Sequence, residues 1–549
     1  MADHVDLTAG VLVIGGGLAG SWAALSAAQH GADVILVDKG YCGTSGVTAT
    51  AGVGHWYLPP EARAAEVAAR TSAGGDLTEP DLMYRTMEVA WQRLPELDPY
   101  YPWPVRDGQP NRASSVRGPE YMRLMRARAR RAGVTILDHH PATELLLHGD
   151  GSVVGASGIR LQQGGTWTCR AAGVILATGG TAFLSRLLGA NNNTADGHLM
   201  AAEAGARFSG MEFSCFYTVA AAHSTMTRAF PFMYGTYRDC EGNELAFQGF
   251  QAGLPMIARA LADGPVTVVL DQMPRRTRER LAHVQPNFLL PLLRKGIDPF
   301  KDPFPVTLRG EGTIRGTGGI ALTSPECQAG VEGLYAAGDV ASREPIVGAA
   351  SGGGQPNSAW CVASGTWSGQ AAARRAAADQ SASRRAWATG TAVLSGTRTA
   401  GAVGVARHAL TADDIEAIRG TVSRELNDID KNMLRTGKGM RRSLVVLDDL
   451  WTRLADHATG TADRHALRTR EAAALVAAGR WVLNSAIARE ESRGMHHRTD
   501  APDRDPWFTR RVTTSGLNRV LTTLASPGEH QPEGGHQVGE RLSREREAS

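Results

Sequence analysis

Short apolar runs and an alanine-rich stretch alternate near the start of the chain. An apolar run over residues 11–14 ends at Gly15, and an alanine-rich segment follows over residues 22–29. A second apolar run over residues 34–37 ends at Asp38. Apolar runs of this length, bounded by turn residues, are typical of buried strands. The pattern therefore predicts a strand, a helix and a second strand over residues 11–38.

The same patterns divide the rest of the chain into further elements. An arginine-rich helix is expected over 121–132, and strands over 134–138, 143–147, 153–161, 166–170, 173–180 and 333–340. A helix is expected from Asn357 onward. Apolar residues at helical spacing, such as Leu444, Leu447 and Leu454, predict amphipathic helices over 410–492.

These elements define an α/β fold class with several domains. We expect a Rossmann-like domain, an inserted α+β capping domain rich in aromatic residues and prolines, and a C-terminal helical domain. The expected ranges are 1–220 and 317–385 for the first domain, 221–316 for the cap, 386–408 for a linker, 409–525 for the helical domain and 526–549 for a disordered tail.

Composition excludes several functional classes. The 549 residues include 58 Lys and Arg against 55 Asp and Glu, a balance that argues against nucleic acid as the main partner. No run approaches the roughly 20 apolar residues of a membrane helix, and the acidic start is not a secretory signal. We therefore expect a cytoplasmic protein without direct membrane insertion. The six cysteines show no Cys-x-x-Cys spacing, so no metal or iron–sulfur motif is expected.

Three glycines follow the first strand at the spacing of a dinucleotide-binding turn. Gly15 permits the tight turn, Gly17 lets a pyrophosphate approach the backbone, and Gly20 lets the helix pack on the strand. The N-terminus of the helix offers free N–H groups to phosphate. Asp38, 18 residues after Gly20, is positioned to accept hydrogen bonds from a ribose.

Two later segments add glycine turns at strand ends. These are Ala177-Thr-Gly-Gly180 and Ala337-Gly-Asp339, and each alone is also consistent with an ordinary turn. Three such sites in one chain favour a long dinucleotide, FAD, over NAD alone.

A larger set of segments then points to one family. The segments are 15–20 with Asp38, 195–201, 204–206, 211–213, 318–320, 333–339, 357–358 and, most specifically, the run Ala488-Arg-Glu-Glu-Ser-Arg-Gly-Met-His496 with residues 497–505 after it. Over residues 8–510 the chain resembles the flavoprotein subunit family of succinate dehydrogenase, fumarate reductase, L-aspartate oxidase and adenylylsulfate reductase. The resemblance implies an FAD domain, a mobile cap and a helical C-terminal domain.

The cofactor-binding residues are carried over from the motifs and this resemblance. They are Gly15, Gly17, Leu18, Ala19, Gly20, Asp38, Lys39, Thr44, Ser45, Gly52, Ala142, Ala177, Thr178, Gly179, Asp196, Gly338, Asp339, Asn357 and Ser358. The helix that starts near Asn357 would stabilise anionic reduced flavin with its N-terminus.

The chain also departs from the succinate and fumarate branch of the family. The loop that supplies a flavin-bonding histidine reads Thr44-Ser45-Gly46-Val47 here, so we expect non-covalent FAD. Tyr217 stands where that branch has a histidine, and 314–319 replaces its His-Tyr-Thr-Met-Gly-Gly segment. Its carboxylate-gripping Gly-Ala-Asn-Arg matches the stretch 351–354, Ser-Gly-Gly-Gly. The arginine-rich cap segment is replaced by the aromatic stretch 229–234. We therefore expect neither a succinate dehydrogenase, nor a fumarate reductase, nor an aspartate oxidase. The chain is expected to be a divergent member that loosely resembles the adenylylsulfate reductase branch.

The substrate is expected between the flavin and the cap. The candidate ligands are Arg315, Tyr217, His223, Arg228, Arg343 and Arg238, with Arg315 the first choice because it lies beside the family's substrate segment, and His223 could be a general acid or base. Each arginine could instead form a structural ion pair, and a lone histidine is usually structural. Arg493 and His496 are expected to support domain docking. No metal site is expected.

The sequence supports three functional hypotheses. The first is an FAD-dependent oxidoreductase that moves a hydride between a small anionic metabolite and FAD and exchanges electrons with a ferredoxin-like iron–sulfur subunit. The second is a flavin oxidase that uses oxygen without a partner. The third is a non-catalytic flavin subunit that relays electrons.

Overall fold

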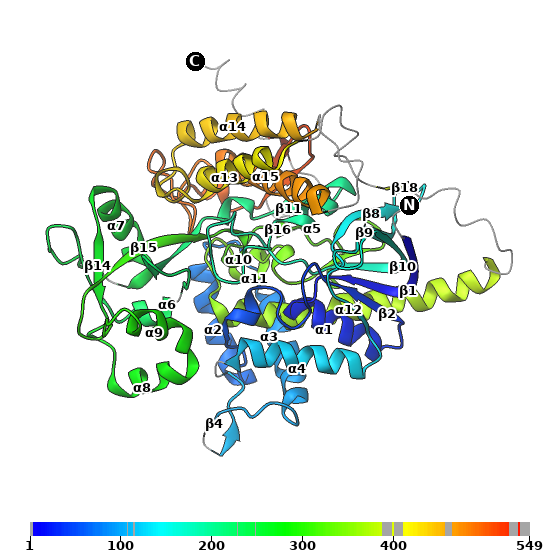
Figure 1. The fold of residues 1–549 in the computed structure, drawn as a ribbon, viewed down its shortest axis with the longest axis horizontal. Coiled ribbons are helices and arrows are strands. Elements are labelled where there is room, and N and C mark those ends of the chain that lie inside the picture. Colours follow the sequence, from blue (N-terminus) through cyan, green and yellow to red (C-terminus); the bar gives the residue numbers. More distant parts are fainter. Residues whose placement is uncertain are drawn as a thin grey trace.

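Three bodies make up the fold: the central sheet with its helices at the lower right, a side domain at the left and a layer of helices at the top (Figure 1). The computed structural model describes residues 4–106, 108–113, 116–227, 229–247, 249–386, 398–399, 410–455, 464–525 and 536–537. Among the described helices, none combines the length and the apolar character that a bilayer crossing requires.

The central sheet contains the predicted strand–helix–strand unit. Its order is β18-β8-β9-β10-β1-β2-β7, with β17 paired to β10. The bounds are β1 His4–Ile14, β2 Val34–Val37, β7 Thr135–Leu137, β8 Ala142–Leu147, β9 Val153–Ile159, β10 Thr166–Leu176, β17 Leu334–Ala336 and β18 Arg398–Thr399. Strands β1, β2, β7, β10 and β17 run parallel. The two strands expected at 166–170 and 173–180 form one strand, β10, because its whole length pairs with β1.

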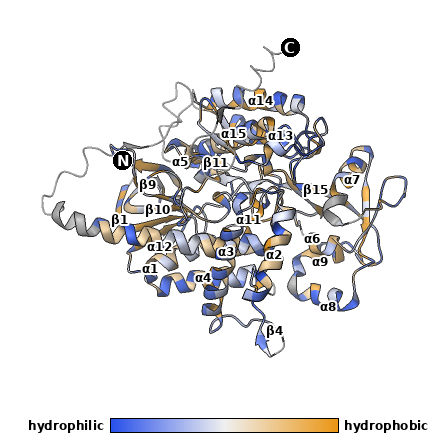
Figure 2. Cartoon of the chain, turned by 180° about the vertical axis from the view of Figure 1, so that it is seen from behind, coloured by the Kyte–Doolittle hydropathy of each residue, from blue (hydrophilic) through white to orange (hydrophobic). Residues whose placement is uncertain are grey.

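Helices pack in a layer on one side of this sheet, where α1 and α12 contact β1 and β10, and the hydropathy colouring shows these apolar strands beside them (Figure 2). These helices are α1 Leu18–Gln29, α2 Pro60–Ala73, α3 Pro80–Arg93, α4 Gly118–Arg131 and α12 Gly354–Ala386. Helix α1 packs closely on α12, where a Cβ on Gly365 would lie 2.6 Å from the carbonyl oxygen of Ala19. This close packing explains why α1 is buried on nearly every side and shows no polar face.

The side domain has its own sheet and its own core. Its sheet has the order β12-β15-β14-β13, with β12 Phe216–Ala221, β13 Thr236–Arg238, β14 Val266–Val269 and β15 Phe304–Glu311. Helices α6 Ala229–Phe232, α7 Phe250–Asp263, α8 Arg275–Val284 and α9 Pro286–Leu293 accompany it. The core includes Phe232, Ile257 and Phe304. The first strand of this sheet starts at Phe216, before the expected cap boundary at 221, and the boundary itself stays a prediction.

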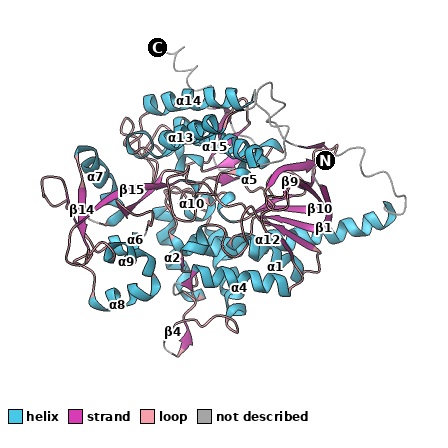
Figure 3. Ribbon diagram, viewed as in Figure 1, coloured by secondary structure: helices cyan, strands magenta, loops and turns pink. Residues whose placement is uncertain are grey.

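The C-terminal part begins as helices and ends as strands (Figure 3). Helices α13 Ala412–Asn427, α14 Gly437–Ala455 and α15 Arg464–Ala488 are followed by β19 Val512–Ser515 and β20 Leu521–Leu524. Strand β19 pairs with β11 Phe208–Ser209, which pairs with β16 Gly319–Ile320. The helical interpretation of this region missed these strands. Apart from β18 and β21 His536–Gln537, the expected linker and tail lie outside the described residues.

Candidate functional site

Each of the three glycines after β1 meets a different geometric demand. Gly15 has a φ of +110°, and a Cβ there would overlap the carbonyl of Ala177. A Cβ on Gly20 would overlap the carbonyl oxygen of Gly15. Gly17 has no atom within 4 Å of its would-be Cβ, so it faces open space. The turn is therefore closed on the protein side and open where a phosphate would lie.

A cavity of about 490 Å³ lies at the carboxyl ends of β1, β2 and β10. This is the edge of an open α/β sheet where ligands generally bind. Its wall includes Gly15, Gly17, Leu18, Ala19, Asp38, Lys39, Thr44, Ser45, Ala142, Ala177, Thr178, Gly179, Asp196 and Asp339 from the predicted cofactor set. Gly20 and Gly338 are not on the wall. Both are glycines because a neighbouring segment packs against them: a Cβ on Gly338 would lie 2.6 Å from the Cβ of Ala19, and a Cβ on Gly20 would overlap the carbonyl oxygen of Gly15.

Asp38 is held in the cavity wall by three donors. The backbone N–H of Gly16 donates to one carboxylate oxygen at 2.6 Å. The N–H of Gly40 and the hydroxyl of Ser45 donate to the other oxygen at 2.7 and 2.6 Å. These bonds fix the orientation of the carboxylate and tie the 40–47 loop to the glycine turn.

Lys39 also lines the cavity, but its ammonium group is already paired. It donates to Thr194 at 2.8 Å, to Asp196 at 2.6 Å and to Glu471 at 2.9 Å. Burial lowers the pKa of Lys39, but the two carboxylates outweigh it and raise the pKa overall. With three acceptors for its three N–H groups, the ammonium group of Lys39 joins the sheet domain to α15, and the place of Lys39 among the cofactor-binding residues stays a prediction.

A second cavity of about 100 Å³ continues the first. The two share Val47, Thr48, Asp339 and Cys361. Gly52, Asn357 and Ser358 from the predicted cofactor set line the second one. Asn357 is 8% exposed, and neither its amide nitrogen nor its carbonyl oxygen has a hydrogen-bond partner. A buried, unpaired carboxamide is costly, so Asn357 fits a ligand that supplies both a donor and an acceptor, as a flavin ring does.

The loop over residues 44–48, which lacks the flavin-bonding histidine of the succinate and fumarate branch, borders both cavities. All five residues line the first cavity, and Val47 and Thr48 also line the second. Gly46 has a φ of +77°, and its nearest neighbour is Gly17 at 3.9 Å from the would-be Cβ. The position that would carry the covalent flavin bond thus lies beside the glycine turn and has no side chain.

A third cavity of about 600 Å³ opens beyond the second. The second and third cavities share Gly52, Arg315 and Gly354. Tyr217 and Phe230 come from the side domain, and Met433 and His497 come from the C-terminal part. All three bodies of the fold therefore meet at this cavity.

Arg315 stands at the junction of the second and third cavities. It ends α10 Gly312–Arg315, and its Nε lies 3.5 Å from the carboxylate of Glu311. The hydroxyl of Thr218 donates to the same carboxylate at 2.5 Å. Because the Arg315 side chain is 29% exposed, it remains accessible to an anion in the cavity.

The other predicted substrate residues have different placements. Tyr217 lines the third cavity, and its hydroxyl donates to the carbonyl of Asn427 at 2.9 Å. His223 is exposed on the side domain and lines none of the three cavities. Arg238 is exposed and pairs with Glu244. Arg228 lies outside the described residues.

Arg343 is 1% exposed and lines none of these cavities. It forms an ion pair with Asp339. It also donates to the carbonyls of Thr313 and Ile314, at 2.8 and 3.0 Å, and of Gly316. Arg343 therefore positions the turn that carries Arg315 and does not face the substrate cavity.

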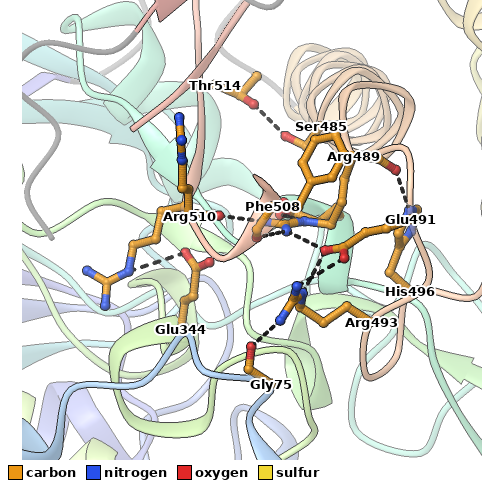
Figure 4. A network of polar contacts seen from close by, with 12 residues as sticks. Gly75, Glu344, Ser485, Arg489, Glu491, Arg493, His496, Phe508, Arg510 and Thr514 are labelled. Atoms are coloured by element: carbon orange, nitrogen blue, oxygen red, sulfur yellow. Dashed lines mark hydrogen bonds and ion pairs between the residues drawn. The ribbon is translucent and has the colours of Figure 1, made fainter. Parts of the chain in front are cut away.

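The C-terminal signature run forms a buried polar network (Figure 4). Arg489 donates to Glu212 at 2.8 Å and to Glu491 at 2.9 Å. Arg493 bonds both oxygens of Glu491, at 2.6 and 3.0 Å, and the carbonyl of Gly75 at 2.5 Å. Nδ1 of His496 accepts from Arg435 at 2.8 Å, and its Nε2–H donates to the carbonyl of Arg489 at 3.1 Å. These contacts join the signature run to the sheet domain.

Sequence reasoning missed several residues of the cavity walls. They are Asn191, Asn192, Asn193, His139, His140, Glu311, Met495 and His497. The run of three asparagines after Gly189 was a visible signal, since consecutive amides are unusual in a packed core. Glu311 gave no local signal, because its place depends on the arrangement of the domains. His497 directly follows the signature run, but no site role was predicted for it.

A glycine turn, a cavity at the carboxyl edge of a parallel sheet and an unpaired Asn357 together define a dinucleotide-binding protein. A family profile described as "FAD binding domain" matches residues 10–356, and one described as "Fumarate reductase flavoprotein C-term" matches residues 425–523. The chain belongs to this flavoprotein family, binds FAD and is an FAD-dependent oxidoreductase. The predicted α/β fold class, FAD-binding domain and C-terminal helical domain are confirmed.

Relatives of the whole chain carry several names. An L-aspartate oxidase of Mycobacterium tuberculosis is 29% identical over 93% of this chain and 96% of its own. A fumarate reductase (CoM/CoB) subunit of Methanothermobacter marburgensis is 25% identical over 93% and 97%. Among solved structures, the E. coli quinol fumarate reductase has a TM-score of 0.75 at 21% identity, covering 96% and 99%. The adenylylsulfate reductase of Archaeoglobus fulgidus has 0.72 at 18%, covering 97% and 98%. These structural likenesses concern the fold.

Proposed function

We propose that this protein exchanges a hydride between an organic anion of low molecular weight and non-covalently bound FAD. One observation carries the proposal: Arg315 lies where the cavity beside Asn357 and Ser358 meets the 600 Å³ cavity. An anion held there would be adjacent to the space expected for the flavin ring. When bound, FAD supplies the two-electron chemistry, and the protein supplies placement and electrostatics.

The residues around this junction have three different roles: binding the anion, orienting Arg315 and forming the cofactor end of the site. Arg315 binds the anionic group, because a guanidinium presents a fork of N–H groups that matches a carboxylate. Glu311 and Thr218 orient Arg315, and Arg343 anchors the turn that carries it. Asn357 and Ser358 at the start of α12, with Gly52 opposite, form the cofactor end of the site.

A proton must move together with the hydride. Tyr217 and His497 are the described lining groups suited to this task. Burial raises the pKa of Tyr217, and its hydroxyl already donates to Asn427, so it holds its proton. Burial and the charge of Arg435 lower the pKa of His497, which leaves its imidazole neutral and able to accept a proton. We therefore assign proton transfer to His497.

The electrons need a second partner. No group of His, Cys, Asp and Glu side chains suited to a metal ion occurs among the described residues. We propose that the electron partner is a separate, ferredoxin-like iron–sulfur subunit in the cytoplasm. The likeness to a protein named as one subunit of a fumarate reductase supports a multi-subunit arrangement.

A second candidate is a flavin oxidase that uses oxygen directly. The match to proteins named L-aspartate oxidase over 93% of the chain favours it. Oxygen consumption by the isolated flavoprotein, measured with the substrate that reduces it, separates the two candidates. Fast consumption supports the oxidase, and reduction without consumption supports the iron–sulfur partner.

The test of the main proposal is anaerobic. Organic anions are added to the purified holoenzyme, and the loss of flavin absorbance is recorded. We expect at least one anion to bleach wild type and the Arg275→Leu control, whose side chain is 94% exposed on α8. Arg315→Leu should lower kcat/KM by about 10²-fold. If neither anions nor their oxidised forms exchange electrons with the flavin, the proposal is wrong.

A further inference from the structure

The size of the third cavity limits what can fill it. Its volume of about 600 Å³ lies within the roughly 300–1,000 Å³ range of pockets that enclose drug-sized ligands. A four-carbon acid would leave much of this space to water. The cavity therefore favours a larger ligand.

The wall of the cavity is largely apolar. The side domain contributes Phe230, Met233 and Leu254, and the C-terminal part contributes Met433 and Met495. Methionine side chains are flexible and polarisable, and adapt to ligands of irregular shape. Phe230 and Met233 are 45% and 58% exposed, so they form an apolar rim at the solvent side. An exposed apolar rim next to a cavity is typical of a binding site.

Charge is confined to one end of the cavity. Arg315 is the permanently charged side chain among its described lining residues. The stretch 351–354 contributes Ser351, Gly353 and Gly354 to the wall, none of them charged. Burial and the charge of Arg435 lower the pKa of His497, so its imidazole carries no charge. A ligand with two carboxylates would therefore leave one of them without a cationic partner in an apolar space, which is costly.

We propose that the substrate is a monoanion whose single anionic group binds Arg315 and whose apolar body, longer than four carbons, fills the space lined by Phe230, Met233 and Leu254. This inference rests on the proposed function, because it names the substrate class of the same site. It replaces the expectation of a small anionic metabolite with a larger, amphipathic one.

The first experiment measures binding without turnover. Straight-chain monocarboxylates from four to ten carbons, and succinate, fumarate and aspartate, are titrated into the holoenzyme, and the shift of the flavin absorbance bands is recorded. We expect affinity to rise about fourfold for each added methylene until the cavity is full. We also expect each dicarboxylate to bind more weakly than the longest monocarboxylates.

Two variants test the two ends of the cavity. Arg315→Leu should abolish the preference for a carboxylate over the primary amide of the same length. Met233→Gln should reduce the affinity gain per methylene, whereas the control Met256→Gln, an exposed methionine of α7 that is not on the cavity wall, should leave it unchanged. Because Met233 is mostly exposed, its substitution should leave the fold intact.

Several results would overturn the inference. They are tighter binding of a dicarboxylate than of any monocarboxylate, an affinity that does not depend on chain length, or no spectral shift with either series. These outcomes differ from failure of the proposed function. Reduction of the flavin by succinate would overturn the proposed substrate class and support the proposed redox function. Binding that depends on chain length, without flavin reduction by any ligand, would support the substrate class and contradict the redox function.

Discussion

Arg343 forms a buried ion pair with Asp339 and, through the same guanidinium, holds the carbonyls of the turn that ends in Arg315. Asp339 lines the two cavities expected to hold the cofactor, and Arg315 lines the substrate cavity. The pair therefore links the cofactor end of the site to the substrate end. One buried side chain sets the geometry of both.

The substitution Arg343→Met should disturb both the cofactor end and the substrate end of the site. It leaves the carboxylate of Asp339 buried without its partner, and breaking such a pair typically costs about 3–5 kcal/mol. We expect a lower melting temperature and FAD affinity reduced at least tenfold, measured by thermal unfolding and by fluorescence titration of the apoprotein. Arg275→Met, in an exposed pair, should change neither. Unchanged FAD affinity in a folded Arg343→Met protein would contradict the linkage.

The glycine turn predicts opposite results for two similar substitutions. Gly17→Val should fold, because a Cβ there meets no atom within 4 Å, but its side chain would enter the phosphate space. Gly20→Val should fail to fold, because its Cβ would overlap the Gly15 carbonyl. Circular dichroism and flavin content check the pair. A yellow Gly17→Val protein with wild-type FAD content would show that the phosphates lie elsewhere.

The flavin should be free of any covalent bond. Gly46 stands where a covalent attachment would need a histidine, and it has no side chain to form the bond. Acid precipitation of the holoenzyme should release all the yellow colour as intact FAD, identified by chromatography and mass. Colour retained in a washed pellet is the contrary result.

The buried carboxylates near the signature run predict a pH dependence of stability. Burial raises the pKa of Glu344 from its usual 4.5 to about 8, and burial also raises the pKa of Glu212. Between pH 4.5 and 8 Glu344 is protonated more in the folded state than in the unfolded state, so its own contribution to stability falls as pH rises. The slope is at most about 1.4 kcal/mol per pH unit for each group.

The substitution Glu344→Gln removes one of these two carboxyl groups with a raised pKa. It should therefore reduce the loss of stability between pH 4.5 and 8. The melting temperature of the variant and of wild type, each measured from about pH 5 to pH 8, checks this expectation. The remaining slope should combine Glu212 with the buried histidines, such as His55 and His198, whose pKa values burial lowers and whose contributions have the opposite sign. Two parallel curves would mean that Glu344 is ionised in the folded protein.

Much of the cofactor site could be predicted from sequence, because its signals are local. The spacing of Gly15, Gly17 and Gly20 is imposed by backbone geometry within one turn, and Asp38 ends the next strand. Most predicted cofactor residues lie on the walls of two connected cavities. Their contact with FAD stays a prediction, to be tested by the variants above.

The roles of the charged residues depended on tertiary structure. In the sequence, Arg315 and Arg343 look alike as candidates for binding substrate, yet one faces a cavity and the other is buried against backbone carbonyls. The ammonium group of Lys39, a predicted cofactor residue, pairs with Glu471, a residue 432 positions away. The sequence by itself determined the nucleotide-binding turn, since neighbouring residues impose it. Only the tertiary structure decided which cations stay accessible, because that depends on partners brought together from distant parts of the chain.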